Sequence, residues 1–302
     1  MKSLEINQIY YGFQLKKCEK LGDISATGYL FTHIKSGARL CYLATEDDNK
    51  VFSVSFKTPP DSGTPHILEH SVLCGSRKYQ AKDPFNELAK GSLNTFLNAM
   101  TYADKTMYPI ASCNEKDFHN MMDVYLDAVF YPNIYTKKGI FLQEGWRYAD
   151  GGNSPEITGV VFNEMKGALS DPESRLAGVI ARSMFGNTTY GMESGGDPDA
   201  IADLTYEAFL DFHRKYYHPS NAYFYLYGDM DVFSCLEHID TAYLSNFNVS
   251  NDLPIITETN VPNAIEWISD TYPAEENEND LEKGYFAYNI KVGKCTDPKR
   301  IL

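Results

Sequence analysis

Short stretches in which hydrophobic and polar residues alternate dominate the first fifth of the chain and predict β-strands. Three of these stretches occupy residues 28–34, 38–45 and 50–56. Turn-forming residues at 36–37 and 47–49 separate them, so the pattern predicts an antiparallel meander. Two later stretches, 101–112 and 221–228, are also typical of strands.

Elsewhere the hydrophobic residues recur every three or four positions, which is the spacing of an amphipathic helix. Two of the expected helices begin after Asn114 and Thr205, both good N-cap residues. Pro65 suits the first turn of another helix, because its missing N–H costs nothing there. The other expected helices lie at 66–73, 84–91, 159–170, 173–185 and 231–247.

The helix that begins after Asn114 has an apolar side that predicts part of the core. This side consists of Phe118, Met121, Met122, Tyr125 and Val129. A stripe at helical spacing is typical of packing rather than of cofactor binding. Strands, then helices, then a strand and a helix again favour an α+β domain, with a mainly antiparallel sheet packed against helices.

The composition changes towards the C-terminal end of the sequence. Residues 248–264 are polar, interrupted by prolines and without periodicity, as expected of a linker. We therefore predict a first domain at 1–247 and a domain boundary within 248–264. Residues 265–302 contain an acidic turn between β-like runs and are too few to form a core of their own. They are interpreted as the incomplete start of a second, similar domain.

Acidic residues outnumber basic ones, and this restricts the classes of partner. Lys and Arg number 27 against 41 Asp and Glu, which gives the 302 residues a formal net charge of −14. This charge has the wrong sign for phosphate backbones and anionic lipids, so we expect no nucleic-acid and no membrane partner. No hydrophobic run approaches the ~20 residues of a transmembrane helix, and the first residues lack the apolar stretch of a signal peptide. These features favour a cytoplasmic, bacterial protein.

The six cysteines are scattered, without a Cys-x-x-Cys pair. They are Cys18, Cys41, Cys74, Cys113, Cys235 and Cys295. This spacing predicts free thiols, each packed as a small buried hydrophobic side chain.

The candidate chemistry is concentrated in the sequence His66-Ile67-Leu68-Glu69-His70. On a helix, His66 and His70 lie one turn apart on the same face, so two imidazoles can reach one metal ion. Glu69 lies beside them and can accept a proton from water. This is the H-x-x-E-H pattern of the inverzincins. The alternative is that both histidines only cap a buried surface.

A catalytic zinc site needs a third protein ligand, and Glu164 is the best candidate. It lies in the otherwise apolar sequence GVVFNEMKG at 159–167, where an unpaired carboxylate would be costly to bury. Metal ligation would remove that cost. The alternative is a glutamate exposed on the far face of its helix.

The remaining histidines and one glycine pair have simpler interpretations. Because they lack ligand spacing, we interpret five histidines as structural or surface residues. These are His33, His119, His213, His218 and His238. The sequence Gly195-Gly196-Asp197-Pro198 predicts a loop before a helix rather than a phosphate cradle, because no Walker-type sequence surrounds it.

Three ordered segments resemble the pitrilysin/insulinase family of zinc peptidases. They are HILEH at 66–70, GSLNTFLNAMTYADKTMYP at 91–109 and GVVFNEMKG at 159–167. The resemblance covers nearly all of residues 8–300 and is greatest to the branch of presequence protease and falcilysin. It implies a pitrilysin-like fold and an endopeptidase that hydrolyses short, unfolded peptides.

The resemblance also implies roles for single residues. It gives one zinc ion per chain, with the ligands His66, His70 and Glu164. Glu69 is then the general base. The segment that matches 98–101 borders the family's cleft, where Asn98 and the backbone of Ala99 would contact the main chain of the peptide. The substrate would be held as an added strand on a sheet edge, which reads backbone more than side chains.

The sequence departs from the family pattern at one supporting residue. In the better-known branches a glutamate that supports the site stands seven residues before the third ligand, and Ile157 occupies that position here. The role passes to Glu144 or to Glu156, and the sequence leaves both open. The alternative for either is a solvated surface carboxylate.

A second departure concerns length. Members of the family fold as four related domains in two halves, and this sequence matches the first domain and the start of the second. The C-terminal half supplies an Arg and a Tyr that orient the substrate carbonyl, and nothing here matches them. We therefore expect the missing half, in the same or another chain, to be a partner.

Three functional hypotheses follow. The favoured one is a zinc metalloendopeptidase that degrades unfolded peptides when the missing half is present. The second is a non-catalytic peptide-binding or structural subunit of the same family, against which the retained Glu69 argues. The third is an unrelated metal-dependent hydrolase with the same motif, which the accompanying NAMT and GVVFNEMKG segments disfavour.

Overall fold

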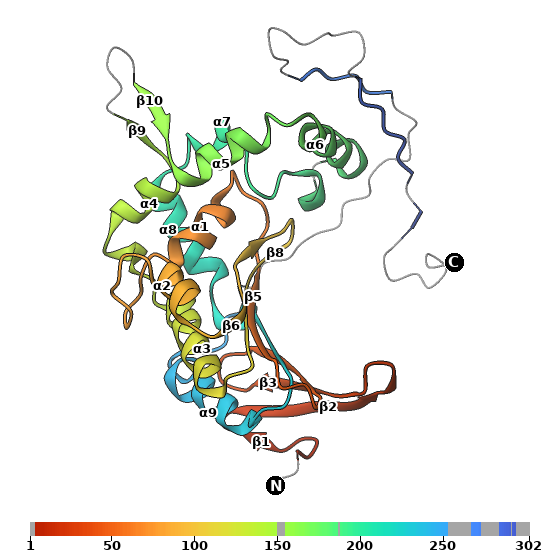
Figure 1. Cartoon of the computed structure of the whole chain (residues 1–302), viewed down its shortest axis with the longest axis vertical. Helices are drawn as coiled ribbons and strands as arrows, with labels where there is room; N and C mark the ends of the chain where they lie inside the picture. The colour runs from red at the N-terminus through yellow and green to blue at the C-terminus, as the bar shows by residue number, and fades with distance from the viewer. Residues whose placement is uncertain are drawn as a thin grey trace.

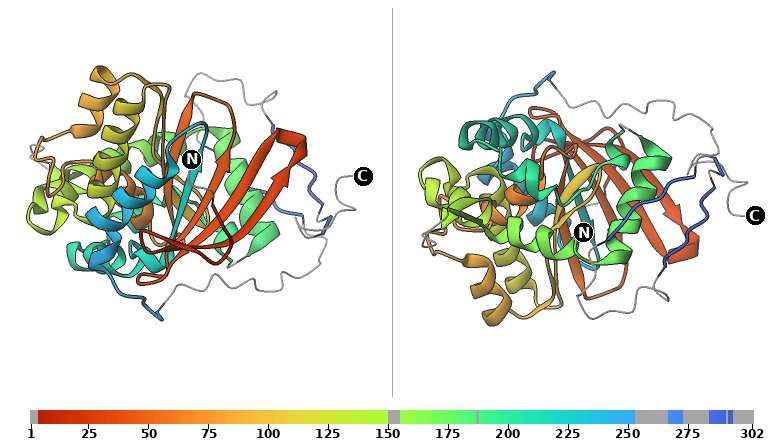
Figure 2. Two further views of the ribbon diagram at one scale, coloured as in Figure 1. Left: turned by 90° about the horizontal axis from the view of Figure 1, so that it is seen from below. Right: turned by 90° about the horizontal axis from the view of Figure 1, so that it is seen from above.

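The protein consists of one large twisted sheet with most of its helices along one side of it (Figures 1 and 2). This arrangement is seen in a computed structural model that describes residues 4–149, 155–186, 188–252, 267–272, 284–290 and 292–293.

The sheet has nine strands, of which all neighbours but one are antiparallel. The strands are β1 (Ile9–Tyr10), β2 (Phe13–Leu21), β3 (Ala26–His33), β4 (Arg39–Ala44), β5 (Lys50–Lys57), β6 (Asn94–Leu97), β7 (Met100–Thr101), β8 (Lys105–Ser112) and β11 (Ala222–Tyr227). Their order is β1-β2-β3-β4-β11-β5-β8-β6, and β7 also pairs with β8. Only β11 and β4 are parallel. The expected α+β class with a mainly antiparallel sheet is confirmed.

The expected meander is right for one pair of strands and wrong for the other. β3 pairs with β4, but β11 lies between β4 and β5. β11 suits this central place because its residues are apolar or aromatic throughout, with Phe224 and Leu226 buried on the side of the helices. The sequence prediction also missed β2, because Lys16, Lys17 and Lys20 hide its alternation, and it missed the short strand β6.

Most of the expected helices begin close to their expected positions, but the helix at Lys138–Glu144 was not predicted. In the described residues the helices are α1 (Thr64–Val72), α2 (Pro84–Gly91), α3 (Glu115–Phe130), α4 (Lys138–Glu144), α5 (Val160–Ala168), α6 (Pro172–Phe185), α7 (Pro198–Ile201), α8 (Tyr206–Tyr216) and α9 (Val232–Ala242). Asn114 and Thr205 cap α3 and α8 through their side chains, as expected. A separate two-stranded sheet joins β9 (Arg147–Ala149) to β10 (Glu156–Thr158).

The last helix is shorter than the sequence predicts. A helix was expected over 231–247, but α9 ends at Ala242 and a single 3-10 turn follows at Leu244–Asn246. Tyr243 leaves the helical conformation, is fully buried, and donates its hydroxyl proton to Asp123 at 2.6 Å. This tertiary contact, which has no signal in the local sequence, outweighs helix propensity.

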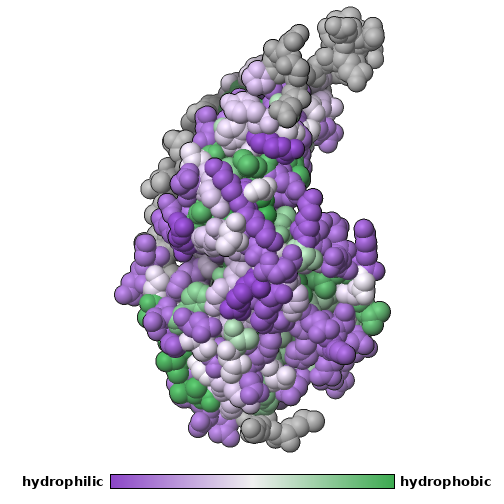
Figure 3. All heavy atoms as spheres, turned by 90° about the vertical axis from the view of Figure 1, so that its left-hand side faces the viewer, coloured by the Kyte–Doolittle hydropathy of each residue, from purple (hydrophilic) through white to green (hydrophobic). Residues whose placement is uncertain are grey.

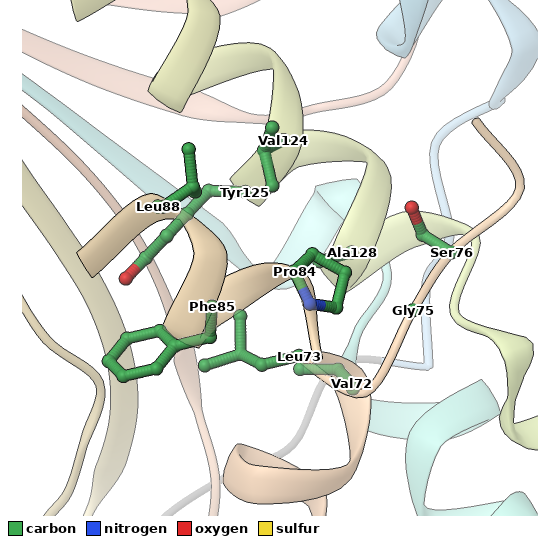
Figure 4. Close-up of a pocket in the computed structure, with 10 residues that line it drawn as sticks. All are labelled: Val72, Leu73, Gly75, Ser76, Pro84, Phe85, Leu88, Val124, Tyr125 and Ala128. Carbon is green, nitrogen blue, oxygen red and sulfur yellow. The ribbon is translucent and has the colours of Figure 1, made fainter. Parts of the chain in front are cut away.

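The core lies between the sheet and the helices. The predicted apolar side of α3 is confirmed, since its five residues are fully buried, and Phe52, Val54 and Phe56 of β5 pack on the same side of the sheet. A small pocket remains where the end of α1 meets α2 and α3 (Figure 4). Its lining is almost wholly apolar and consists of Val72, Leu73, Gly75, Ser76, Pro84, Phe85, Leu88, Val124, Tyr125 and Ala128.

The outer surface is mostly polar. The face shown in Figure 3 is largely hydrophilic, with small separate hydrophobic patches. Among the described residues, no helix has the length and apolar character needed to cross a bilayer.

The cysteine prediction is confirmed for pairing and wrong in part for burial. The five cysteines in the described residues are free thiols. Only Cys235 is buried, whereas Cys18 and Cys113 are exposed, because they lie on the projecting strand β2 and directly after β8. Cys295 lies outside the described residues.

The predicted linker and second domain fall largely outside the described residues. Most of 248–264 and most of 265–302 belong to that part of the chain, so the boundary stays a prediction. The residues described in this region, 267–272, 284–290 and 292–293, form no helix or strand. The β-like runs therefore do not form strands where the structure describes them.

Candidate metal centre

The two histidines of the motif lie on a helix that is buried on nearly every side. α1 begins after Gly63, whose positive φ of 85° turns the chain into the helix, and Pro65 occupies the first turn as expected. α1 contacts α4, α8 and β7 (Figure 1). The rings of His66 and His70 lie on one face, with their centroids 5.0 Å apart.

The third predicted ligand reaches the same place from another helix. α5 buries Val161, Phe162 and Met165, and Glu164 points to the two histidines. Its Oε2 atom lies 3.8 Å from His66 Nε2 and 3.7 Å from His70 Nε2. Although Glu164 is exposed, its carboxylate is directed at the histidine pair.

The three side chains have the spacing of a metal site. One potential ligand atom from each of His66, His70 and Glu164 lies within 4.8 Å of the others, and no other such group of three occurs in the described residues. Two ligand atoms on bonds of about 2.1 Å at a tetrahedral angle lie about 3.4 Å apart. The observed distances thus need only small side-chain movements to fit a zinc-sized ion, and we call these three residues the metal centre.

Glu144 supports His70 from behind. Its Oε2 atom lies 3.3 Å from His70 Nδ1, and its Oε1 atom accepts hydrogen bonds from Gln143 at 2.7 Å and from the thiol of Cys74 at 3.6 Å. Glu144 is buried at the end of α4. Glu156, the other candidate, is exposed in the β9–β10 hairpin, beside Ile157. The structure therefore places Glu144, and not Glu156, at the metal centre.

This contact changes the proton affinity of both partners. Burial favours neutral His70, but the hydrogen bond to Glu144 and the nearby carboxylate charges outweigh burial and raise the pKa of His70 above its ordinary value. Burial also opposes ionisation of Glu144, yet its hydrogen bonds with His70 and Gln143 prevail and lower the pKa of that carboxyl. Burial and the nearby Glu144 charge raise the pKa of the Cys74 thiol, so it stays protonated and acts as a donor.

A backbone carbonyl supports His66. His66 Nδ1 lies 3.0 Å from the carbonyl oxygen of Gly195, in the loop that the sequence predicts before α7. A Cβ atom on Gly195 would lie 2.3 Å from Met165 Sδ, so glycine allows the backbone to approach α5 this closely. The loop prediction is confirmed, since Asp197 caps α7. The sequence contains no local signal for the contact with His66.

Glu69 has a hydrogen-bond partner that the sequence analysis missed. The carboxylate is buried, with 8% of the residue exposed, and its Oε2 atom accepts a hydrogen bond from Thr101 Oγ1 at 2.6 Å. Thr101 lies in β7, within the NAMT segment. The family resemblance implies peptide contacts for this segment, but no contact with Glu69.

Asn98 and Ala99 lie between β6 and β7, at the end of the sheet. Asn98 is exposed and Ala99 half-buried. The carbonyl of Asn98 accepts a hydrogen bond from the Tyr125 hydroxyl at 3.1 Å, and the N–H of Ala99 donates to Asn98 Oδ1 at 2.9 Å. These bonds fix the segment beside the edge strand β6, and its contact with a peptide stays a prediction.

The other histidines lie away from the metal centre. His33 contacts Ser36 and Asp240, and His213 contacts the Tyr135 hydroxyl. In the described residues none of the five joins a group of three possible metal ligands.

Comparison with known proteins places these observations in a family. The sequence profile described as "Insulinase (Peptidase family M16)" matches residues 55–138, and the one described as "Peptidase M16 inactive domain" matches residues 203–294. "Protein HypA" of Clostridium perfringens is 52% identical over 300 residues, which cover 98% of this chain and 31% of that protein. "Presequence protease 1, chloroplastic/mitochondrial" of Arabidopsis thaliana is 51% identical over 243 residues, which cover 79% of this chain and 22% of that protein. The chain thus spans less than a third of the length of these relatives.

Solved structures share the fold. The crystal structure of pitrilysin superposes with a TM-score of 0.59 at 18% identity, covering 78% of this chain and 25% of that chain. A protease from Helicobacter pylori gives a TM-score of 0.60 at 19% identity, covering 76% and 53% of the two chains. These likenesses confirm the expected pitrilysin-like fold.

Proposed function

The chain belongs to the insulinase family, peptidase family M16, and from this premise we propose that it is the metal-holding part of a zinc endopeptidase that cleaves short, unfolded peptides. One observation carries the proposal: two imidazoles and a carboxylate from separate helices converge within 4.8 Å. A buried glutamate, Glu69, directly precedes one of them.

The donor set fits one zinc ion per chain. Two histidines and one glutamate are a known ligand set of catalytic zinc sites, which keep a fourth position open. When bound, zinc polarises a carbonyl and lowers the pKa of water at the site. The Gly195 carbonyl and the Glu144 carboxylate each hold a histidine Nδ1. Each Nδ1 therefore carries its proton, and each Nε2 presents a lone pair to the ion.

Glu69 supplies the proton transfers of the proposed reaction. Its carboxylate takes the proton of the attacking water and later passes it to the leaving amine. Because Glu69 is no member of the metal centre, replacing it removes the base while the ligands stay in place.

The peptide is proposed to bind along the edge of the sheet. β6 is the last strand in the order, so one side of it offers unpaired backbone groups. Asn98 and Ala99 follow directly and are proposed to contact the peptide main chain. The net charge of −14 favours basic peptides, and organellar presequences, which are Arg-rich and poor in acidic residues, are of this kind. The name of the Arabidopsis relative agrees with this substrate class.

The whole reaction is proposed to need more than these residues. The chain covers 31% of the Clostridium relative and 22% of the Arabidopsis relative. We propose that the part corresponding to the remainder, in the same or another chain, completes the substrate site.

The first test is the amount of bound metal. After loading with zinc, the parent and Glu69→Gln are expected to hold about one zinc per chain and His70→Ala almost none. Mass spectrometry of the metal and of the protein measures this ratio. A parent that binds no zinc would contradict the proposed metal centre.

The second test separates an enzyme from a non-catalytic subunit. Hydrolysis of a basic unfolded peptide is followed with the full-length natural protein and with its Glu69→Gln variant. Zinc-dependent cleavage that the variant loses supports the endopeptidase. Binding of the peptide by both proteins without cleavage supports the peptide-binding subunit instead.

A further inference from the structure

We propose that Thr101 is a positioning residue, which holds the carboxylate of Glu69 in the orientation required for proton transfer. This inference rests on the proposed function and adds a residue whose role neither the motif nor the ligand set indicates.

The hydrogen bond leaves the two oxygens of Glu69 in different states. Thr101 Oγ1 donates to Oε2 at 2.6 Å. Within the described part of the chain, this is the one hydrogen bond that reaches the Glu69 side chain, so Oε1 stays available as an acceptor. The pair therefore divides the carboxylate into a fixed oxygen and an oxygen that is available to the attacking water.

Thr101 is itself rigidly placed. It pairs with Thr106 of β8, and β7 contacts α1, which carries Glu69. A β-branched side chain has few χ1 rotamers, so the direction of the hydroxyl follows from the strand. Glutamate, in contrast, has three side-chain torsions and loses much rotamer entropy when it is ordered. The hydrogen bond from Thr101 in β7 therefore restrains the carboxylate of Glu69, which α1 alone leaves free to rotate.

The position of Thr101 also relates the base to the substrate. Asn98 and Ala99, the proposed contacts of the peptide main chain, lie three and two residues before Thr101 in the same segment. Tyr125 fixes this segment from below through the carbonyl of Asn98. The short segment 98–101 would therefore contact a bound peptide at one end and Glu69 at the other, and so fix their relative positions.

The test compares two substitutions at Thr101 with one at its neighbour. Thr101→Val keeps the shape and removes the hydroxyl, whereas Thr101→Ser keeps the hydroxyl. Thr106→Val is the matched control, because it removes a fully buried hydroxyl, bonded to Thr58 at 2.8 Å, from the opposite residue of the same strand pair. All variants are made in the full-length natural protein, loaded with zinc, and checked for metal content and folding.

We expect a loss confined to kcat. Misplaced reacting groups cost up to about 100-fold in rate, so Thr101→Val should lower kcat about 10- to 100-fold with KM and zinc content unchanged. Thr101→Ser should restore most of the rate, and Thr106→Val should leave kcat unchanged. Equal kcat in Thr101→Val and the parent would overturn the inference.

Crystal structures of the zinc-loaded parent, Thr101→Val and Thr101→Ser provide a readout that does not depend on activity. The Glu69 carboxylate should occupy one orientation in the parent and in Thr101→Ser, and several in Thr101→Val. One unchanged orientation in all three overturns the role of Thr101. If the parent cleaves no peptide, the proposed function fails, while this comparison still decides whether Thr101 orders Glu69.

Discussion

Two clusters of histidine and carboxylate side chains include residues of α1 or of the loop after it, and their hydrogen bonding differs. The Asp123 cluster consists of Asp123, Lys78, Tyr79, His238 and Tyr243. Asp123 accepts hydrogen bonds from Lys78 Nζ at 2.8 Å and from the Tyr79 and Tyr243 hydroxyls at 2.6 Å each, and His238 Nε2 lies 2.9 Å away. In the metal centre, by contrast, the nitrogens and the Glu164 oxygen stand 3.7 and 3.8 Å apart, too far for hydrogen bonds.

The difference separates a structural cluster from a binding site. In the Asp123 cluster donors surround one acceptor, so the charge is satisfied within the protein and the contacts stabilise the fold. In the metal centre the Glu164 carboxylate faces two imidazole nitrogens without a hydrogen bond to either, an arrangement that a bound cation stabilises. Substitutions in the two clusters should therefore have opposite effects on stability and on metal-dependent activity.

The largest effect is expected for Glu69→Gln. Loss of a general base costs about 100- to 10,000-fold in rate, while the three ligands of the metal centre remain. Measured on the full-length natural protein, peptide hydrolysis should fall sharply. The zinc content should stay constant. Hydrolysis that persists at the parental rate would show that another group takes the proton.

Asp123→Ala should give the opposite result. Removing the half-buried Asp123 carboxylate leaves its donors, among them the buried Tyr243 hydroxyl, without their acceptor, and we expect a loss of about 3 kcal/mol in the free energy of unfolding. Urea denaturation measures this loss, and zinc content should not change. Asp211→Ala, which breaks an exposed ion pair with Arg214, is the control and should cost less than about 1 kcal/mol. An equal cost of the two substitutions would refute the structural role of the Asp123 cluster.

Glu144→Gln should weaken zinc binding without abolishing it. Loss of a carboxylate that orients a metal-bound histidine typically lowers metal affinity about 10- to 100-fold. Competition with a chelator measures the affinity. Glu156→Gln is the matched control, because Glu156 is exposed in the β9–β10 hairpin. The zinc affinity of this variant should equal that of the parent. The reverse ranking of the two variants would assign the supporting role to Glu156.

The smallest effect concerns pH. Burial opposes ionisation of Asp123, but its hydrogen bonds with His238, Lys78, Tyr243 and Tyr79 prevail and hold the pKa of that carboxyl well below its usual range. An unfolded aspartate has a pKa of about 3.9, so the stabilisation is complete above that value and is lost as pH falls below it. The difference in unfolding free energy between the parent and Asp123→Asn should be present in full at about pH 5 and shrink below about pH 4. A difference that is as large at about pH 3 as at about pH 5 would contradict the lowered pKa of Asp123.

Only part of the metal centre is predicted from a local signal. Glu164 lies far from the histidines in the sequence and was proposed because a zinc site needs a third ligand, and the burial expected for it is wrong, since it is exposed. His66 and His70 were predicted because one helical turn relates them. The caps Asn114 and Thr205 and the apolar side of α3 were predicted for the same reason. Local spacing and hydrogen bonding within a few residues determine these features.

The supporting contacts have no local signal, because they join distant residues, and the family resemblance offered only Glu144, as one of two candidates. Thr101 lies 32 residues from Glu69, Glu144 lies 74 from His70, and Gly195 lies 129 from His66. No periodic pattern relates such positions, and a backbone carbonyl such as that of Gly195 has no side-chain signal. The place of β11 between β4 and β5 was missed for the same reason.

This place of β11 also sets a condition on how the chain folds. β4 and β5 each present an unpaired edge until β11 fills the gap, and β11 begins at Ala222, 165 residues after β5 ends at Lys57. At about 5 to 20 residues per second, a ribosome needs roughly 8 to 33 seconds to make that interval. Throughout this time β4 and β5 each have an edge with unpaired backbone N–H and C=O groups, which can pair with other strands. Completion of this sheet therefore depends on non-local pairing, which in general slows folding.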